Sequence, residues 1–243
     1  MSVPVIDLFA GPGGLGEGFS RCRSSEFEIA VSIEKDGMAF ETLQLRAAHR
    51  ALKKSAHVDK STWQVWDRVL AEFPWNIAFD KLKSCGVPAI AEACKIALSE
   101  AWNLELGSDN RAVVSAGIRK RLSKHFKKGA LPDNSVLIGG PPCQAYSIVG
   151  RSRNKGKAGY KAVEDHRHFL YREYLHVISE FRPAVFVMEN VKGLLSATFK
   201  GTSVINRIVR DLQRPSVAID NAPKDLTYKL YSLTDEEAAA GEV

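Results

Sequence analysis

The sequence lacks the features that would place it in a membrane or in an oxidising compartment. No apolar run approaches the roughly 20 residues that a transmembrane helix needs, and the first residues lack the charged-then-apolar layout of a signal peptide. Only four of the 243 residues are cysteine, with no Cys-x-x-Cys pair and no ligand cluster with histidine. We therefore expect no disulfide framework, no metal site and a cytoplasmic location with reduced thiols.

Positive charge is in modest excess, with 34 lysines and arginines against 28 acidic residues and a formal net charge of +6. This balance favours a polyanionic partner such as nucleic acid, although many soluble proteins are equally basic. The length suits one α/β domain, or one domain with an insertion.

Short apolar strands alternate with helices along the chain, as in a doubly wound, mostly parallel α/β sheet. The order opens with a strand at residues 3–9, a glycine-rich turn, a helix at 15–23 and a second strand at 27–33. The further strands that we expect are residues 135–138, 184–188 and 228–233, and the further helices are residues 111–126, 166–181 and 201–213.

A long helical segment interrupts this alternation after the second strand. Trp63, Trp66, Leu70 and Phe73 recur at steps of three and four residues, which predicts an amphipathic helix. We interpret residues from about 50 to about 110 as a helical insertion packed on the main sheet.

Residues suited to chemistry follow the ends of the predicted strands, where open α/β sheets bind their ligands. Gly11, Gly13 and Gly16 have the Gly-x-Gly-x-x-Gly spacing after the first strand, and Glu34 ends the second. The glycines let the backbone approach a ligand, and the carboxylate can accept bonds from ribose hydroxyls. A nicotinamide-dependent dehydrogenase would show the same motif, and so would a structural turn that binds nothing.

Cys143 stands in a second motif, since residues 139–144 read Gly-Gly-Pro-Pro-Cys-Gln. A lone cysteine is more often a packed residue than a nucleophile. Here two prolines stiffen the turn, and a loop rich in glycine and cations follows. This setting favours covalent catalysis by the thiol.

Glu189 stands in a third motif, because residues 186–191 read Phe-Val-Met-Glu-Asn-Val. The apolar strand puts its carboxylate on the same rim of the sheet as Cys143. If it is partly buried there, the glutamate could stay protonated near neutral pH and serve as a hydrogen-bond donor or acid. A cap on the following turn would also explain the residue.

Together the motifs resemble the cytosine carbon-5 DNA methyltransferase family. Residues 7–14 (Asp-Leu-Phe-Ala-Gly-Pro-Gly-Gly), 142–144 (Pro-Cys-Gln) and 189–191 (Glu-Asn-Val) are similar to its first, fourth and sixth motifs, in the same order. The resemblance implies that residues 1–243 form an S-adenosylmethionine-dependent methyltransferase domain with a Rossmann-like fold. It covers residues 3–50 and about 111–233.

The resemblance also implies a mechanism, in which a methyl group passes from S-adenosylmethionine to carbon 5 of a cytosine flipped out of double-stranded DNA. Cys143 would add to ring carbon 6, and Glu189 would hold ring nitrogen 3. The implied cofactor-binding residues are Phe9, Ala10, Gly11, Pro12, Gly13, Glu34, Pro142 and Leu170. The implied nucleic-acid-binding residues are Gln144, Ser147, Arg151 and Arg153.

The sequence departs from the family pattern at two places. The third motif usually offers an acid to the adenine amino group, but residues 117–119 read Gly-Ile-Arg, so the adenine partner is unassigned. The family's Gln-x-Arg-x-Arg motif, recognition domain and closing helix should follow residues 228–233, whereas the sequence stops at Val243. We expect a second chain or a missing C-terminal part to supply them.

Three rival interpretations remain. One is an RNA-directed member of the same family that methylates a transfer RNA. Another is a non-catalytic subunit of a two-chain methyltransferase, against which the intact Cys143 and Glu189 argue. A nicotinamide-dependent dehydrogenase leaves the Pro-Cys-Gln and Glu-Asn-Val motifs unexplained.

Overall fold

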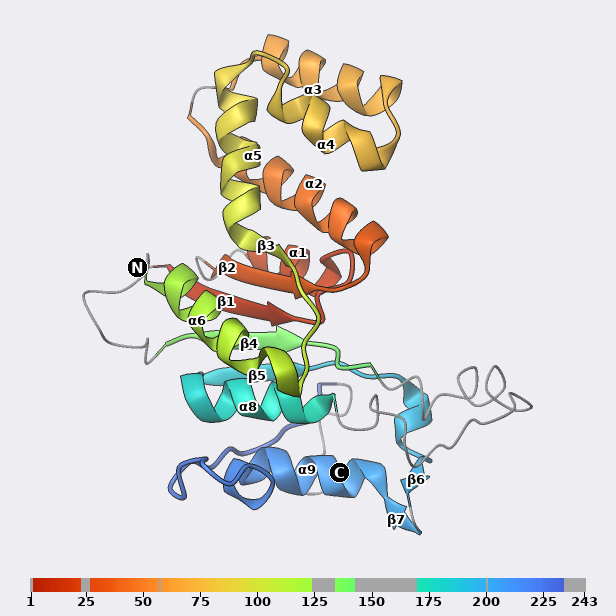
Figure 1. Cartoon of the computed structure of the whole chain (residues 1–243), viewed down its shortest axis with the longest axis vertical. Helices are drawn as coiled ribbons and strands as arrows, with labels where there is room; N and C mark the ends of the chain where they lie inside the picture. The colour runs from red at the N-terminus through yellow and green to blue at the C-terminus, as the bar shows by residue number, and fades with distance from the viewer. Residues whose placement is uncertain are drawn as a thin grey trace.

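A parallel five-stranded sheet forms the centre of the molecule (Figure 1). The computed structural model describes residues 2–22, 27–56, 58–123, 134–142, 170–199 and 201–233. The strands are β1 (Val3–Leu8), β2 (Phe27–Glu34), β3 (Ala101–Asn103), β4 (Val136–Gly139) and β5 (Val185–Met188). Their order is β3-β2-β1-β4-β5, and each neighbouring pair is parallel. The predicted α/β fold class is therefore confirmed.

The register of the strands brings their carboxyl ends to one edge of the sheet. Leu8 of β1 pairs with Ile33 of β2 and with Gly139 of β4, and Gly139 pairs in turn with Met188 of β5. Glu34 is the partner of Asn103 on β3. The residues that follow these positions are therefore neighbours, although they are far apart in the sequence.

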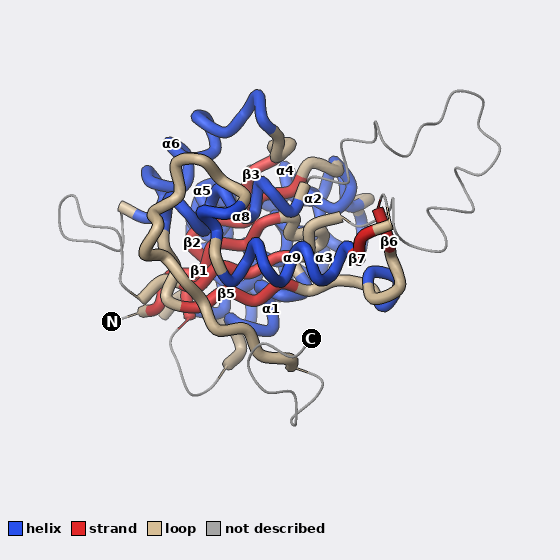
Figure 2. Tube along the Cα trace, turned by 90° about the horizontal axis from the view of Figure 1, so that it is seen from below, coloured by secondary structure: helices blue, strands red, loops and turns tan. Residues whose placement is uncertain are grey.

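Helices cover both faces of the sheet (Figure 2). The helices of the described residues are α1 (Gly14–Ser20), α2 (Gly37–Lys54), α3 (Lys60–Glu72), α4 (Trp75–Lys83), α5 (Pro88–Glu100), α6 (Arg111–Leu122), α8 (Tyr171–Phe181) and α9 (Val204–Gln213), of which α3 and α4 stand away from the sheet (Figure 1). The side chains of β1 alternate between the faces, as expected for a strand. Val5 packs with residues of α1, whereas Ile6 and Leu8 pack with residues of α6 and α8.

Helices α2 to α5 form a helical bundle with a hydrophobic core of its own. Leu52, Trp66, Leu82 and Ile90 are buried in that core. The helical bundle stands at the β3 end of the sheet (Figure 1), and α2 and α5 make its contacts with β2 and β3.

The predicted range of the helical insertion needs correction. Helix α2 begins at Gly37, where the Asp36 side chain accepts a hydrogen bond from the Ala39 backbone N–H. The last helix of the bundle ends at Glu100, and Ala101–Asn103 is strand β3 of the main sheet, which the range 50–110 wrongly included. Three residues directly after a helix are too few to show a strand period.

The strand expected at residues 228–233 is absent from the described sheet, so that prediction is wrong. The Tyr228 backbone N–H donates to the Gln213 carbonyl at 3.0 Å, and its hydroxyl donates to the Pro183 carbonyl at 2.9 Å. Its ring packs edge-on against Phe186, with 5.0 Å between centroids. Side-chain packing against β5, and not a strand ladder, therefore fixes this segment.

The remaining differences are small. The helix expected at residues 201–213 begins at Val204, because Thr202–Ser203 (β7) pairs with Thr198–Phe199 (β6) in a short antiparallel hairpin. Short 3-10 helices occur at Ser108–Asn110, Lys192–Leu194 and Pro215–Val217. In the part of the chain that the structure describes, no helix is long and apolar enough to cross a bilayer.

Candidate functional site

The turn after β1 has an unusual backbone. Phe9, Gly11 and Gly13 have φ angles of 55°, 56° and 87°, in the left-handed region that favours glycine. The Ala10 N–H donates to the Ile33 carbonyl at 3.0 Å, and the Gly13 N–H donates to the Ala10 carbonyl at 2.9 Å. These bonds fold the chain sharply back before α1 begins.

Helix α2 supports this turn from one side. Arg46 donates a hydrogen bond to the Pro12 carbonyl at 2.9 Å. A Cβ atom on Gly13 would lie 2.8 Å from a methyl group of Leu43, so a larger residue would have to displace that side chain as well as adopt a strained φ of 87°. By contrast, a Cβ on Gly11 or Gly14 would meet no atom within 4 Å. The turn is thus packed on one side and open on the other, as a ligand-binding turn must be.

Glu34 lies beside this turn and is partly buried. Its Oε2 accepts the Gly11 N–H at 2.8 Å, and its Oε1 accepts the Asp36 N–H at 2.7 Å. A carboxylate has about four acceptor positions. Each oxygen can therefore still accept one further hydrogen bond, which fits the two hydroxyl groups of a ribose.

Asn103 at the end of β3 belongs to the same edge, although the sequence motifs did not reveal it. Its Nδ2 donates to the carbonyls of Glu34 and Lys35 at 2.9 and 3.2 Å. The family pattern directed attention to residues 117–119 instead, but these residues lie within α6. There a Cβ on Gly117 would collide with the ring of Trp102. No sequence signal marks Asn103, because β3 has only three residues and its partners on β2 are 68 and 69 residues away.

The ends of β4 and β5 approach each other closely. A Cβ on Gly140 would lie 2.9 Å from Oε2 of Glu189, so the carboxylate lies over that glycine. The Glu189 N–H donates to the Gly139 carbonyl at 3.0 Å, and Asn190 Nδ2 donates to the Pro141 carbonyl at 3.2 Å. The Glu-Asn motif is thereby joined to the start of the Pro-Pro-Cys-Gln motif.

The partial burial considered for Glu189 is not found, because the residue is exposed. It follows β5, the last strand of the described sheet, and the turn there opens towards solvent. The residues Cys143, Gln144, Ser147, Arg151 and Arg153 lie outside the described residues. Pro142 is partly buried and follows the buried Pro141.

Leu170 stands at the start of α8, where its carbonyl accepts the Glu173 N–H at 3.1 Å. A helix that returns between two parallel strands begins at their carboxyl edge. Tyr174 fixes α8 against the sheet, since its hydroxyl lies within hydrogen-bond distance of the carbonyls of Leu137 and Val187, at 3.2 and 3.0 Å, and can donate its proton to either. Leu170 is therefore on the same side of the molecule as the strand ends.

A cluster of buried charged groups lies beneath the turn. Asp7 is fully buried next to Gly16, and neither of its oxygens has a partner at full hydrogen-bond geometry in the described residues. Burial raises the pKa of Asp7 to about 8; Glu100 acts in the same direction, and the charge of Arg50 opposes it. Arg50 joins Glu17 of α1 to Glu100 of α5.

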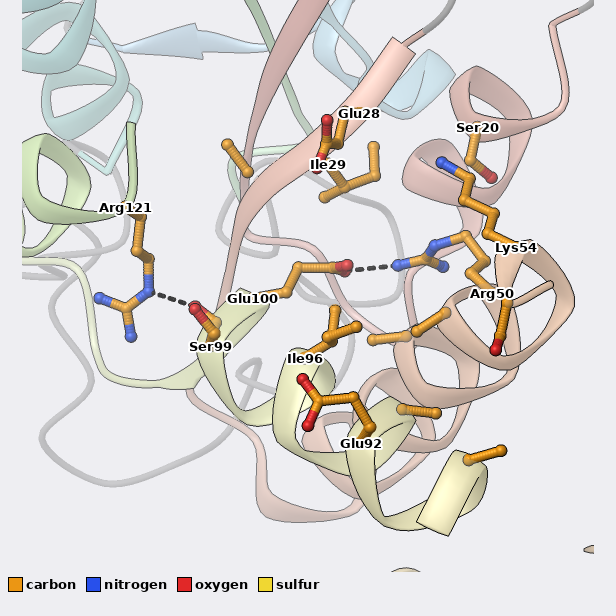
Figure 3. A pocket seen from close by; sticks show the side chains of 16 residues that line it. Ser20, Glu28, Ile29, Arg50, Lys54, Glu92, Ile96, Ser99, Glu100 and Arg121 are labelled. Carbon is orange, nitrogen blue, oxygen red and sulfur yellow. Dashed lines mark hydrogen bonds and ion pairs between the residues drawn. The ribbon is translucent and has the colours of Figure 1, made fainter. Parts of the chain in front are cut away.

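A cavity of about 400 Å³ lies beside this cluster and not at the strand ends (Figure 3). Glu28 and Ile29, from the amino-terminal half of β2, form one wall, and Arg50 and Glu100 lie on the opposite side. The cavity is therefore separate from the carboxyl edge of the sheet. Within the described ranges, no three histidine, cysteine, aspartate or glutamate residues come together as a metal site.

Comparison with known proteins shows one family. Residues 109–214 match the model of the C-5 cytosine-specific DNA methylase family. The chain is 35% identical over 197 residues to the type II methyltransferase M.Bpa9945I of Bacillus paralicheniformis, covering 79% of this chain and 41% of that protein.

Two further relatives give the same result. The type II methyltransferase M.XorII of Xanthomonas oryzae is 28% identical over 195 residues, which are 80% of this chain and 30% of that protein. The type II methyltransferase M.AquIA of Picosynechococcus is 26% identical over 196 residues, which are 81% of this chain and 51% of that protein. The chain thus spans about half the length of these relatives or less.

Proposed function

Since this chain belongs to the C-5 cytosine-specific DNA methylase family, we propose that it forms the catalytic part of an enzyme that methylates carbon 5 of cytosine in double-stranded DNA. One observation carries the proposal. A single edge of the sheet holds both the glycine turn with Glu34 and the Glu189 carboxylate, which lies over Gly140, three residues before Cys143. A cofactor bound at the glycine turn and a cytosine held beside Glu189 would therefore be neighbours.

The cofactor in this proposal is S-adenosylmethionine, which supplies an electrophilic methyl group when it is bound. The open side of the turn at Gly11 and the unused acceptor positions of Glu34 suit an adenosine ribose. The remaining contacts would come from the residues that the family resemblance implies. They are Phe9, Ala10, Pro12, Gly13, Pro142 and Leu170.

The chemistry in this proposal is covalent. The Cys143 thiolate forms a bond with ring carbon 6 of cytosine, and the electron pair of the 5,6 double bond becomes available at carbon 5. A proton shared between Glu189 and ring nitrogen 3 would hold the ring and offset the negative charge that develops in it. Carbon 5 would take the methyl group and S-adenosylhomocysteine would be left as the product. A base would then remove the carbon-5 proton, and the thiolate would leave as the double bond re-forms.

The DNA in this proposal is bound in part by residues after the cysteine. Gln144, Ser147, Arg151 and Arg153 would contact it, and the net charge of +6 favours phosphates. We further propose that additional polypeptide, in the same chain or in a second one, reads the base sequence. The names of the relatives support a place in a restriction–modification system, and we propose a cytoplasmic location.

A trapping experiment tests the catalytic assignment. Duplex DNA with 5-fluorocytosine has no removable proton at carbon 5, so the enzyme should remain covalently attached after methyl transfer. We expect the adduct to map by mass spectrometry to Cys143, and Cys143→Ala to abolish both adduct and methyl transfer. Cys85→Ala is the matched control and should keep both.

The position of the adduct, together with assays of methyl transfer and cofactor binding, tests the nucleophile and two rival interpretations. An adduct at Cys22, Cys85 or Cys94 would overturn the assignment of the nucleophile. Methyl transfer to a transfer RNA and not to DNA would identify the RNA-directed alternative. If the assembled protein binds the cofactor but transfers no methyl group to either substrate, a non-catalytic subunit would be the better description.

A further inference from the structure

Asn103 forms a bridge between two strand ends. It is the last residue of β3 and stands opposite Glu34 in the register. Its Nδ2 donates to the Glu34 carbonyl at 2.9 Å and to the Lys35 carbonyl at 3.2 Å. The Leu104 N–H donates to the same Glu34 carbonyl at 3.1 Å. The backbone ladder between β2 and β3 ends at this pair. The Asn103 side chain adds one more hydrogen bond beyond it, to the carbonyl of Lys35.

The turn that Asn103 holds is the one that carries the Glu34 carboxylate. That carboxylate bridges two backbone N–H groups, one from Gly11 in the glycine turn and one from Asp36 at the start of α2. The backbone of Glu34 is thus fixed from β3, while its side chain faces the turn after β1. Loss of the Asn103 hydrogen bonds would let the backbone at Lys35 move. The Glu34 carboxylate would then no longer be held in one direction.

A second link runs beside this one. Lys35 Nζ forms an exposed ion pair with Oε1 of Glu105 at 2.7 Å. The carbonyl of Glu105 accepts a hydrogen bond from Asn110 Nδ2 at 3.0 Å. Asn110 therefore makes the same kind of bond as Asn103, in the same segment, but it does not touch the turn at Glu34.

We propose that Asn103 is a positioning residue for the cofactor: it fixes the end of β2 so that the Glu34 carboxylate can hold both ribose hydroxyls. This inference rests on the proposed function, because it needs a ribose at Glu34. Asn103 acts through Glu34 and does not itself have to contact the ligand. Its side chain is exposed, so its replacement should leave the fold intact.

The test measures binding of S-adenosylhomocysteine by calorimetry, with the protein otherwise unaltered. Asn103→Ala removes two hydrogen bonds and should weaken binding by about two- to tenfold, as expected for net contributions near 1 kcal/mol. Asn103→Asp should weaken it at least as much, because a carboxylate cannot donate to the two carbonyls. Asn110→Ala is the matched control and should bind as the unaltered chain does.

Two further readouts separate positioning from a general loss of structure. In a Glu34→Ala background, Asn103→Ala should cause no additional loss, because both changes act on one contact. The unaltered protein should prefer the ribose ligand over its 2′-deoxy analogue, and Asn103→Ala should reduce that preference.

The outcomes distinguish the inference from the function on which it rests. If the unaltered protein fails to bind S-adenosylhomocysteine, the proposed cofactor is wrong, and the inference falls with it. If the unaltered protein binds but Asn103→Ala binds equally well, only the inference is overturned. An equal loss in the presence and absence of Glu34 would also overturn it, since Asn103 would then act independently.

Discussion

At the scale of single residues, Asp7 makes stability depend on pH. Its pKa is raised from 3.8 to about 8, first by burial. A raised pKa means that the folded state binds the proton more tightly than the unfolded state does. The contribution of this group to folding is therefore greatest below pH 3.8 and is lost as the pH rises towards 8.

Asp7→Asn should remove this dependence, because the amide has the same shape and no charge. We expect a melting temperature higher by roughly 4 °C or more at pH 9, and little change at pH 4, since one pKa unit corresponds to about 1.4 kcal/mol. Thermal melts from pH 4 to 9 measure it, with the exposed Asp67→Asn as control. An equal effect at both ends of the pH range would show that the charge of Asp7 is not responsible.

At the scale of elements, the close contact between β1 and β4 depends on Gly139. A Cβ at this position would lie inside contact distance of the Leu8 carbonyl oxygen, and it would also meet the Tyr174 ring at 3.2 Å. Backbone atoms of a neighbouring strand cannot move aside without breaking the ladder. Gly139 is thus required for the pairing that brings the two halves of the candidate site together.

Gly139→Ala should therefore lower the free energy of unfolding by about 1–3 kcal/mol, the usual cost of overpacking, or prevent folding altogether. Gly107→Ala is a suitable control, because a Cβ there meets no atom within 4 Å and the backbone is extended. Urea unfolding of the two variants tests the idea. Equal stability of Gly139→Ala and the unaltered chain would contradict it.

Some strands could be predicted from the sequence and others could not, for physical reasons. Strands β1, β2, β4 and β5 are mainly apolar runs with a clear end: β1 stops at the glycine turn, β2 and β5 stop at or before a glutamate, and β4 stops at a glycine. The local pattern is therefore sufficient to predict these strands. Strand β3 has only the three residues Ala101–Asn103, and its strand character comes from pairing with β2. Residues 228–233 have a strand-like alternation, but in the described structure they pair with no strand.

The candidate site shows the same division. The sequence puts Glu34 and Glu189 next to strand ends, because a strand ends where its apolar run ends. Asn103 could not be found in that way. Its partners are 68 and 69 residues away, and only the strand register shows that they are adjacent.

At the scale of the whole molecule, Arg50 connects the helical bundle to α1, which packs on the sheet. It lies on α2 and forms ion pairs with Glu17 of α1 and Glu100 of α5, and all three side chains are at most 15% exposed. Burial raises the pKa of Glu100 to about 7, and Arg50 opposes that rise. Removal of Arg50 would leave the buried Glu100 without its ion-pair partner, whereas the partly buried Glu17 would keep its ion pair with Arg21.

Arg50→Met should thus destabilise the protein by about 3–5 kcal/mol, as found when one partner of a buried pair is removed. The loss should be larger at pH 9, where Glu100 is ionised, than at pH 5, where it can hold a proton. Denaturant unfolding at the two pH values measures this, with the exposed Arg68→Met as control. The idea fails if Arg50→Met is as stable as Arg68→Met.

The strand order has a consequence for the time course of folding. The core of the helical bundle is built from residues within 37–100, so its contacts are local. In the sheet, Val5 of β1 instead pairs with Val136 of β4. This pairing cannot form until the whole intervening chain and β4 have been synthesised. Local contacts form quickly and distant ones slowly. During synthesis the helical bundle should therefore fold while β1 still lacks β4, and the edge that joins Glu34 to Glu189 should be among the last parts to form.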